Sequence, residues 1–391
     1  MTAAHGGRRV LLLVNADCTD RERHSPRGPR GPRRRSDFDA IAEALGADVL
    51  DWSAVRSSTL GSLIERAAGW YVAAAALALL RHRRYRLIWC MSEKEGAMLA
   101  LAFKIVRART PLMMVAVVPT SRAMWAMVRV LRVQSHITCM YPTSSLARDT
   151  LVSQWKLPAE KVVLLPYQVD VDFFDPRWAD GSPSEVPLVV AVGRESRDYE
   201  TLLAAVRDLP IRLTIAPGSH WAPEREEAWR AALAPNVTVV TCDYVALRDL
   251  YASSAFVVVP LHETTVQNGT TAVQEAMAMG RAVVVTRTTG QRDLIADDPG
   301  DAHEGPGPLA DGVFARLFAP SDKYLRGPTG IYVPPHDVVA LRAAIERLLR
   351  DPGLASELGA RGRAVCCAVV SLDRHVERIL EAARPYLGDA P

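Results

Sequence analysis

The most informative segment of the chain begins with Phe256-Val-Val-Val-Pro-Leu261 and a polar loop, and continues with Thr270-Thr-Ala-Val-Gln-Glu-Ala-Met-Ala-Met-Gly280 and Ala282-Val-Val-Val285. The apolar runs predict buried strands, and the segment between them predicts a helix ended by glycine, the order found in parallel α/β sheets. Amides of the loop and the helix N-terminus suit a phosphate, and Glu275 can bind two adjacent hydroxyls, as on a ribose. The stretch indicates a site for a phosphorylated, hydroxyl-rich ligand, although an ordinary strand-to-helix turn also explains it.

Three further segments accompany it: Val162-Val-Leu-Leu-Pro-Tyr-Gln-Val-Asp170, Leu188-Val-Val-Ala-Val-Gly-Arg194 and Thr329-Gly-Ile-Tyr-Val-Pro-Pro335. In this order, with the Glu-Ala-Met-Ala-x-Gly helix, they resemble the retaining family-4 glycosyltransferases (glycosyl transferases group 1) of the GT-B fold. The resemblance extends from about residue 162 to 363 and is weak before residue 149. It implies an α/β protein with two doubly wound, Rossmann-like domains facing across a cleft, and a C-terminal helix crossing back to the first domain.

Composition agrees with that fold. A chain of 391 residues with 49% hydrophobic content can bury two cores. The net charge of +3 argues against nucleic acid as a partner. Because arginine supplies nearly all of the 47 basic residues, as in high-GC genomes, arginine clusters are weak functional evidence.

The cysteines and the apolar runs bear on localisation. The six cysteines show no paired metal-ligand spacing, so we expect free thiols in a reducing compartment. No apolar stretch reaches the roughly 18 residues that a membrane-spanning helix needs. We therefore expect a cytoplasmic protein with at most peripheral contact at the inner membrane face.

Alternating strand and helix patterns predict two parallel sheets. We expect a first domain at residues 1–182, a second at 183–371, and a helix at 372–391 that packs on the first. The Pro- and Gly-rich residues 297–328 predict a surface loop. Strands are expected at 9–14, 47–50, 86–90, 112–118, 136–140, 162–165, 188–192, 211–215, 237–241, 255–259, 282–285 and 331–333. Helices are expected at 37–45, 60–82, 94–107, 121–132, 144–155, 198–207, 223–233, 246–252, 270–279, 337–350, 353–366 and 372–387.

The resemblance implies a nucleotide diphosphate sugar as donor, with no metal and no cofactor. Gly193 ends a strand that faces the site, and Arg194 and Arg197 follow it where the family holds the diphosphate with an arginine and a lysine. Two cations there would neutralise the leaving group as the glycosidic bond breaks. The loop is two residues shorter than the family pattern, and solvated loop arginines are the alternative interpretation.

The resemblance also assigns the rest of the donor site. Glu275 matches the family glutamate that binds the ribose, and Gln267 stands where the family has its other glutamate. An amide can bind a sugar hydroxyl but cannot supply negative charge. The remaining assignments are Tyr244 at the base and Asn268, Gly269, Thr270 and Thr271 at the distal phosphate and sugar.

The first half departs from the family. Asn15-Ala-Asp17 replaces the glycine pair after the first strand, and Val117-Val-Pro119 replaces a histidine near the transferred sugar. Glu93 and Glu95 follow a strand and could position an acceptor. Acidic residues in the first turn of a capped helix explain the same pattern, and this simpler interpretation is the one we prefer.

Two segments concern the acceptor, which the sequence does not identify. Arg21 to Arg35 is rich in arginine, proline and glycine and could attract an anionic or lipid-linked acceptor; a solvated loop is the alternative. Trp70 to Leu80, followed by a basic run, could lie at a membrane interface. A core helix that ends in cations is the interpretation we prefer.

These observations predict a retaining glycosyltransferase that moves a hexose-like sugar from a UDP or GDP donor to an acceptor hydroxyl. The changes in the first half leave a second hypothesis, a non-catalytic GT-B partner protein that keeps the nucleotide site. A nucleotide-sugar epimerase or a phosphorylase on the same fold is a third, but neither shows its own motif.

Overall fold

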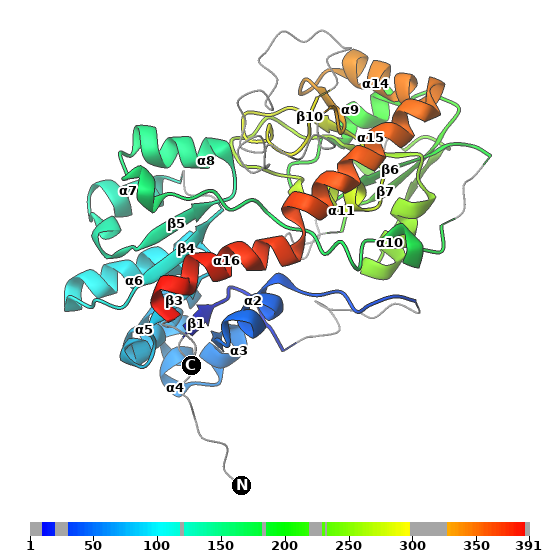
Figure 1. Ribbon diagram of the computed structural model, residues 1–391. Helices are drawn as coiled ribbons and strands as arrows, with labels where there is room; N and C mark the ends of the chain where they lie inside the picture. Colours follow the sequence, from blue (N-terminus) through cyan, green and yellow to red (C-terminus); the bar gives the residue numbers. More distant parts are fainter. Residues whose placement is uncertain are drawn as a thin grey trace. The chain divides into compact units, whose positions relative to one another are not determined.

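The computed structural model describes residues 10–19, 30–117, 121–181, 185–218, 229–230, 233–297 and 327–387 (Figure 1). These residues form two compact units. Unit 1 contains the described residues of 10–19, 35–166 and 372–387, and unit 2 contains those of 30–34 and 167–371. The sequence placed the domain boundary after residue 182, whereas residues 167–181 pack within unit 2, as does the short segment 30–34.

Unit 1 is built on a five-stranded parallel sheet with the order β2-β1-β3-β4-β5. Most of its strands are buried on both faces, which explains their continuous apolar sequences. The chain changes direction across the sheet between β1 and β3, and ligands bind at such switch points. The strands are β1 (Val10–Leu13), β2 (Asp48–Leu50), β3 (Leu87–Cys90), β4 (Leu112–Ala116) and β5 (Cys139–Pro142).

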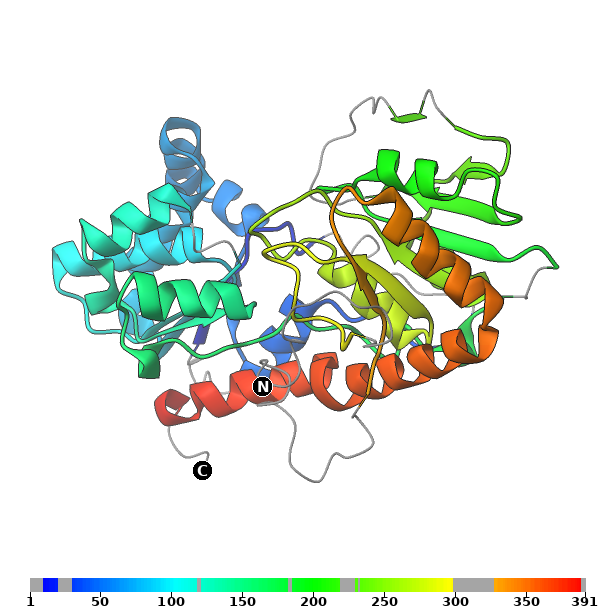
Figure 2. The same ribbon diagram turned by 90° about the horizontal axis from the view of Figure 1, so that it is seen from above.

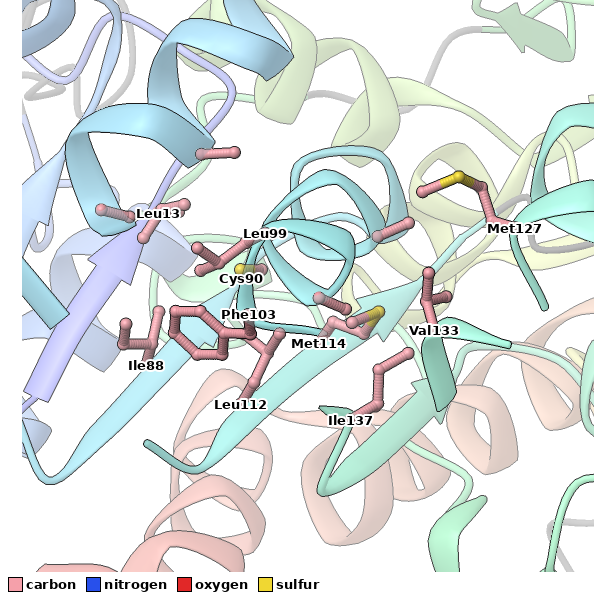
Figure 3. Close-up of a cluster of buried hydrophobic side chains, with 14 of the residues drawn as sticks. Leu13, Ile88, Cys90, Leu99, Phe103, Leu112, Met114, Met127, Val133 and Ile137 are labelled. Atoms are coloured by element: carbon pink, nitrogen blue, oxygen red, sulfur yellow. The ribbon is translucent and has the colours of Figure 1, made fainter. Parts of the chain in front are cut away.

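Helices cover both faces of this sheet. Figure 3 shows Phe103 of α6 beside Ile88 of β3 and Leu112 of β4, in the cluster of buried side chains on one face. On the other face, Ile41 of α2 and Ile379 of α16 belong to a second buried cluster. The helices of unit 1 are α2 (Asp37–Leu45), α3 (Trp52–Arg56), α4 (Thr59–Ala68), α5 (Trp70–Arg81), α6 (Glu93–Val106), α7 (Arg122–Arg129), α8 (Ser145–Asp149) and α16 (Leu372–Leu387).

Three predicted elements of unit 1 differ from the structure. The single helix expected at 60–82 is two helices, because Gly69 adopts φ 85°, a left-handed conformation that ends α4. The helix expected at 144–155 is the short α8 followed by a π-helical turn at Thr150–Gln154. The strand expected at 162–165 is reduced to an isolated bridge between Val162 and Met140.

Helix α5 is a core helix. Its apolar residues Trp70, Ala74 and Leu77 are buried in the cluster beneath α6. The burial of these side chains agrees with the preferred interpretation of this segment as a core helix, because buried side chains are not available to a membrane surface. Among the helices of the described residues, none is both long and apolar enough to cross a membrane.

Unit 2 is built on a six-stranded parallel sheet with the order β11-β10-β9-β6-β7-β8. The chain runs from β6 outward to β8, then returns to β9 beside β6 and continues to β11 on the other side. The switch point therefore lies between the carboxyl ends of β6 and β9. The strands are β6 (Leu188–Val192), β7 (Arg212–Ala216), β8 (Val237–Val239), β9 (Phe256–Val259), β10 (Ala282–Thr286) and β11 (Ile331–Val333).

Helices cover both faces of the unit 2 sheet, and among the described residues α15 also packs against β10. Helices α9 and α14 pack against each other on one face, where α14 (orange in Figure 2) lies along the strands. Helices α10 and α11 pack on the other face with Tyr251 and Val273 in the core. The bounds are α9 (Tyr199–Ala205), α10 (Tyr244–Ser253), α11 (Thr270–Ala278), α14 (Val338–Arg350) and α15 (Pro352–Val365). The helix expected at 223–233 and the loop expected at 297–328 lie mostly outside the described residues.

The cysteines are all free, as the sequence predicts. Cys90, Cys139 and Cys366 are buried, and Cys367 is exposed. Burial raises the pKa of each of these thiols, which keeps them protonated at neutral pH.

Candidate functional site

The candidate site lies at the switch point of the unit 2 sheet. The loops after β6 and β9 are joined there by an antiparallel bridge between Arg197 and Leu261. The Asp198 amide donates to the carbonyl of Pro260 at 3.2 Å, and the His262 amide donates to the carbonyl of Ser196 at 2.9 Å. The backbone therefore fixes the two loops that the sequence predicts to hold a nucleotide.

Glu275 is the buried carboxylate of this site. Glu275 lies on α11, which begins after Gly269, and it is only 8% exposed. The Tyr251 hydroxyl donates to Oε2 of Glu275 at 3.1 Å. Burial raises the pKa of Glu275 to about 7, against the opposing charge of Arg34 and the hydrogen bond from Tyr251. The carboxylate is therefore costly to ionise without a ligand and has hydrogen-bonding capacity left for hydroxyl donors.

Arg197 is buried beneath the loop after β6. Its Nε donates to the carbonyl of Val192 at 2.8 Å, and Nη1 donates to the carbonyl of Glu195 at 2.7 Å. Burial lowers the pKa of this guanidinium. The side chain lies against Gly193, whose φ of 96° and missing Cβ leave room for it. In this arrangement Arg197 shapes the loop and places positive charge below it.

Arg194 lies in the same loop, at its beginning. It is half-buried, next to the exposed Glu195 and directly after Gly193. The Gly193 amide donates to the carbonyl of Ala216 at 3.0 Å, and the Tyr199 hydroxyl donates to the carbonyl of Gly193. The strand end that carries Arg194 is thus held from two neighbouring elements.

The loop before α11 combines fixed backbone with a buried amide. The Asn268 side chain donates to Oγ of Ser196 at 2.9 Å, and the backbone carbonyl of Asn268 accepts from Nε2 of Gln291 at 2.7 Å. Thr270 Oγ1 donates to the carbonyl of Gln267 at 2.8 Å. Gln267 is 9% exposed, and its Oε1 meets no donor among the described residues. Such a buried acceptor is a natural partner for a ligand hydroxyl.

The remaining loop residues start the helix. Gly269 adopts φ 79°, and a Cβ there would collide with Val259. Thr270 is buried and Thr271 is exposed on the first turn of α11. Because no side chain of the described residues caps this N-terminus, its amides are oriented for an anion.

Two residues of the candidate site, Arg34 and Gln291, were not predicted from the sequence. Arg34, dismissed with the rest of the arginine-rich run, places its guanidinium 4.1 Å above the ring of Tyr244 and is close enough to Glu275 to lower its pKa. The segment is anchored by an ion pair between Arg30 and Asp180 at 2.8 Å. Gln291, which is fully buried and holds Asn268, is the other. Only spatial proximity reveals either residue.

In unit 1, Glu93 and Glu95 lie at the sheet's switch point, in the first turn of α6. Ser92 caps this helix by accepting from the Lys94 amide at 3.1 Å, as the simpler interpretation predicts. Glu93 accepts from the Val117 amide at 2.9 Å and so holds the end of β4. Glu95 is fully buried, and burial raises its pKa to about 8.

The position of the expected glycine pair carries a polar cluster instead. The Asn15 side chain donates to the Tyr71 hydroxyl at 3.2 Å and accepts from Nε1 of Trp52 at 3.0 Å. Asn15 therefore ties the end of β1 to α3 and α5 of unit 1. Of the segment 117–119, only Val117 is described.

Comparisons with known proteins agree with this architecture. Residues 186–351 match the family model described as glycosyl transferases group 1. A glycosyltransferase from Rickettsia africae is 13% identical, covers 98% of this chain and 100% of its own, and has a TM-score of 0.65. Sucrose-phosphate synthase from Thermosynechococcus elongatus is 19% identical over 97% of this chain and 99% of its own, with a TM-score of 0.62. HepE from Anabaena, solved with UDP-glucose, is 16% identical over 96% of this chain and 99% of its own, with a TM-score of 0.62.

A comparison with curated protein sequences finds no match. The family match and the structural similarity confirm two predictions from the sequence, the GT-B fold and the resemblance to group 1 glycosyl transferases.

Proposed function

Taking the chain as a group 1 glycosyl transferase domain on a GT-B fold, we propose that the protein is a retaining hexosyltransferase using a UDP or GDP sugar. The observation that carries this proposal is the buried carboxylate of Glu275 beside the uncapped N-terminus of α11. The carboxylate of Glu275 suits the hydroxyls of a ribose. The backbone amides at the N-terminus of α11 suit a phosphate. HepE, which shares the fold, was solved with UDP-glucose, and this favours UDP as the first donor to test.

The donor would bind along the switch point. Tyr244 and Arg34 would contact the base and the ribose, and Glu275 would accept the ribose hydroxyls. The diphosphate would meet the amides of 268–271 and the charge of Arg194, with Arg197 supporting that loop from below. The buried Oε1 of Gln267 would accept a sugar hydroxyl.

The chemistry follows from this placement. The bond between the anomeric carbon and the diphosphate oxygen breaks, and positive charge near the diphosphate stabilises the charge that develops on it. The acceptor oxygen bonds to the same face of the sugar, and its proton passes to the departing phosphate. This route requires no protein nucleophile and no metal at the diphosphate. The reaction therefore depends mostly on positioning and charge.

The acceptor would be selected by unit 1. Glu93 would hold the end of β4 in this region, and Glu95, kept neutral by burial, would support it from inside unit 1. The arginine-rich run at 21–35, part of which packs within unit 2, would in addition favour an anionic or lipid-linked acceptor. A cytoplasmic enzyme with peripheral membrane contact fits such an acceptor, and the free thiols agree with a reducing compartment.

A second function, nucleotide binding without transfer, is favoured by one observation. Asn15 and its polar partners occupy the place where the family carries its glycine pair. This substitution concerns unit 1 alone and leaves the donor residues of unit 2 intact.

The deciding experiment is calorimetry of the purified chain with UDP, GDP, ADP, dTDP and their sugars, without added metal. It is followed by detection of nucleotide release with and without acceptor sugars. Saturable binding and turnover support the transferase. Binding without turnover for any acceptor supports the second function, and no binding refutes both.

A further inference from the structure

Three side chains outside the proposed donor site converge at the carboxyl ends of the unit 2 strands. Asp198 follows β6, His262 follows β9, and His336 follows β11. One possible ligand atom from each lies within 4.8 Å of the others. We propose that Asp198, His262 and His336 bind a divalent transition-metal ion, with Zn²⁺ as the first candidate.

The distances suit a shared ion. Nδ1 of His336 lies 2.7 Å from Oδ2 of Asp198, and Nδ1 of His262 lies 3.7 Å from the same oxygen. The two imidazole rings are 5.3 Å apart between centroids. Ligands of tetrahedral zinc, at bonds of about 2.0–2.1 Å, are separated by roughly 3.3 Å. Both separations between histidine and carboxylate atoms therefore lie within about 1 Å of this value.

An ordinary ion pair does not account for both histidines. The Thr201 amide donates to Oδ1 of Asp198 at 3.0 Å, and its hydroxyl donates to Oδ2 at 2.8 Å. With His336 also at Oδ2, the carboxylate has its partners already. A second imidazole directed at the same oxygen is explained by a cation that all three side chains share. Two histidines and one carboxylate are also a common ligand set of zinc.

The backbone holds the ligands in place before any ion binds. Asp198 is 3% exposed and is fixed as the N-cap of α9, with Thr201 as the kind of supporting partner that orients metal ligands. His336 adopts φ 59°, a left-handed conformation that costs a non-glycine residue energy. Strain of this kind is concentrated at functional positions.

The histidines leave the ion accessible. Their side chains are 48% and 57% exposed, so an ion can enter from solvent and keep water in its open positions. The site would tie together the loops after three strands. One of these loops contains Ser196, which accepts from the Asn268 side chain of the proposed donor loop. The metal site itself does not depend on the proposed transferase activity.

The test uses the full, untagged chain, stripped of metal with a chelator and titrated with Zn²⁺ by calorimetry and with Co²⁺ by absorption spectroscopy. His336→Ala and His262→Ala should each weaken Zn²⁺ binding at least tenfold and remove the Co²⁺ ligand-field bands, because each removes a ligand. Zn²⁺ should also raise the melting temperature of the wild type and not of the variants.

The control is His136→Ala, at a half-buried histidine of unit 1 that bonds to Ser135. This variant should bind Zn²⁺ and Co²⁺ like the wild type. The proposal is overturned if the wild type shows no saturable binding. It is also overturned if both histidine variants of unit 2 keep the wild-type affinity, which would place any bound ion elsewhere, for example on thiols.

Discussion

Glu275→Gln tests the donor site most directly, because the same substitution should stabilise the protein and weaken nucleotide binding. Burial raises the pKa of Glu275 from 4.5 to about 7 in the folded chain. The folded state therefore holds a proton that the unfolded state has released between these pH values, and stability falls as pH rises through that window. At roughly 1.36 kcal/mol per pH unit, the loss reaches about 3 kcal/mol above pH 7.

Glutamine keeps the shape and can still accept from Tyr251, but it does not titrate. Relative to wild type, Glu275→Gln should therefore gain about 2–3 kcal/mol of unfolding free energy between pH 5 and pH 8. The measurement is urea denaturation of both proteins at the two pH values, without nucleotide. Glu263→Gln is the matched control, since this exposed glutamate lies in the same loop region and accepts from the Thr289 amide at 2.8 Å.

Binding should change in the opposite direction. Hydrogen bonds to a charged acceptor contribute about 1.5–3 kcal/mol, so Glu275→Gln should weaken UDP binding roughly 10- to 100-fold at pH 8. In the wild type, UDP affinity should rise between pH 6 and pH 8 as the carboxylate ionises, and in the variant it should not. Equal UDP affinity in both proteins, or a stability difference that does not vary with pH, would refute the reasoning.

Three further substitutions test neighbouring parts of the structure. Arg34→Ala should weaken UDP binding about tenfold by removing a cation over the Tyr244 ring, whereas Arg212→Ala, at an exposed arginine of β7, should change it less than twofold; calorimetry that finds the two variants alike would exclude the role of Arg34. Gly193→Ala should cost ~1–3 kcal/mol in urea denaturation, since its φ is 96° and a buried guanidinium fills the space, and Gly218→Ala, with open space, should cost little. The unfolding free energy of Glu95→Gln relative to wild type should increase as pH rises from 5 to 8, because burial raises the pKa of this glutamate to about 8. A difference in unfolding free energy that does not change with pH would contradict the raised pKa.

The sequence by itself determined the elements whose signal is local. The runs 188–192, 256–259 and 282–285 are apolar throughout because parallel strands are buried on both faces, so they were predicted nearly to the residue. The glycines and the polar loop between strand and helix likewise give a local signal, and from them the sequence predicts the nucleotide site that we propose. The single helix expected at 60–82 was wrong, because helical periodicity continues past Gly69 while the backbone does not.

Tertiary structure decided which of these groups can act together. Nothing near Arg34 in the sequence shows that it lies over Tyr244, and nothing near Arg197 shows that its guanidinium is buried under its own loop. Asp198, His262 and His336 converge only because β6, β9 and β11 run parallel, which brings their carboxyl ends to one edge of the sheet. The hydrophobic pattern of the sequence predicts which residues are buried. Contacts between residues that are distant in the sequence form only when the sheet assembles, and the pKa shifts follow from these contacts.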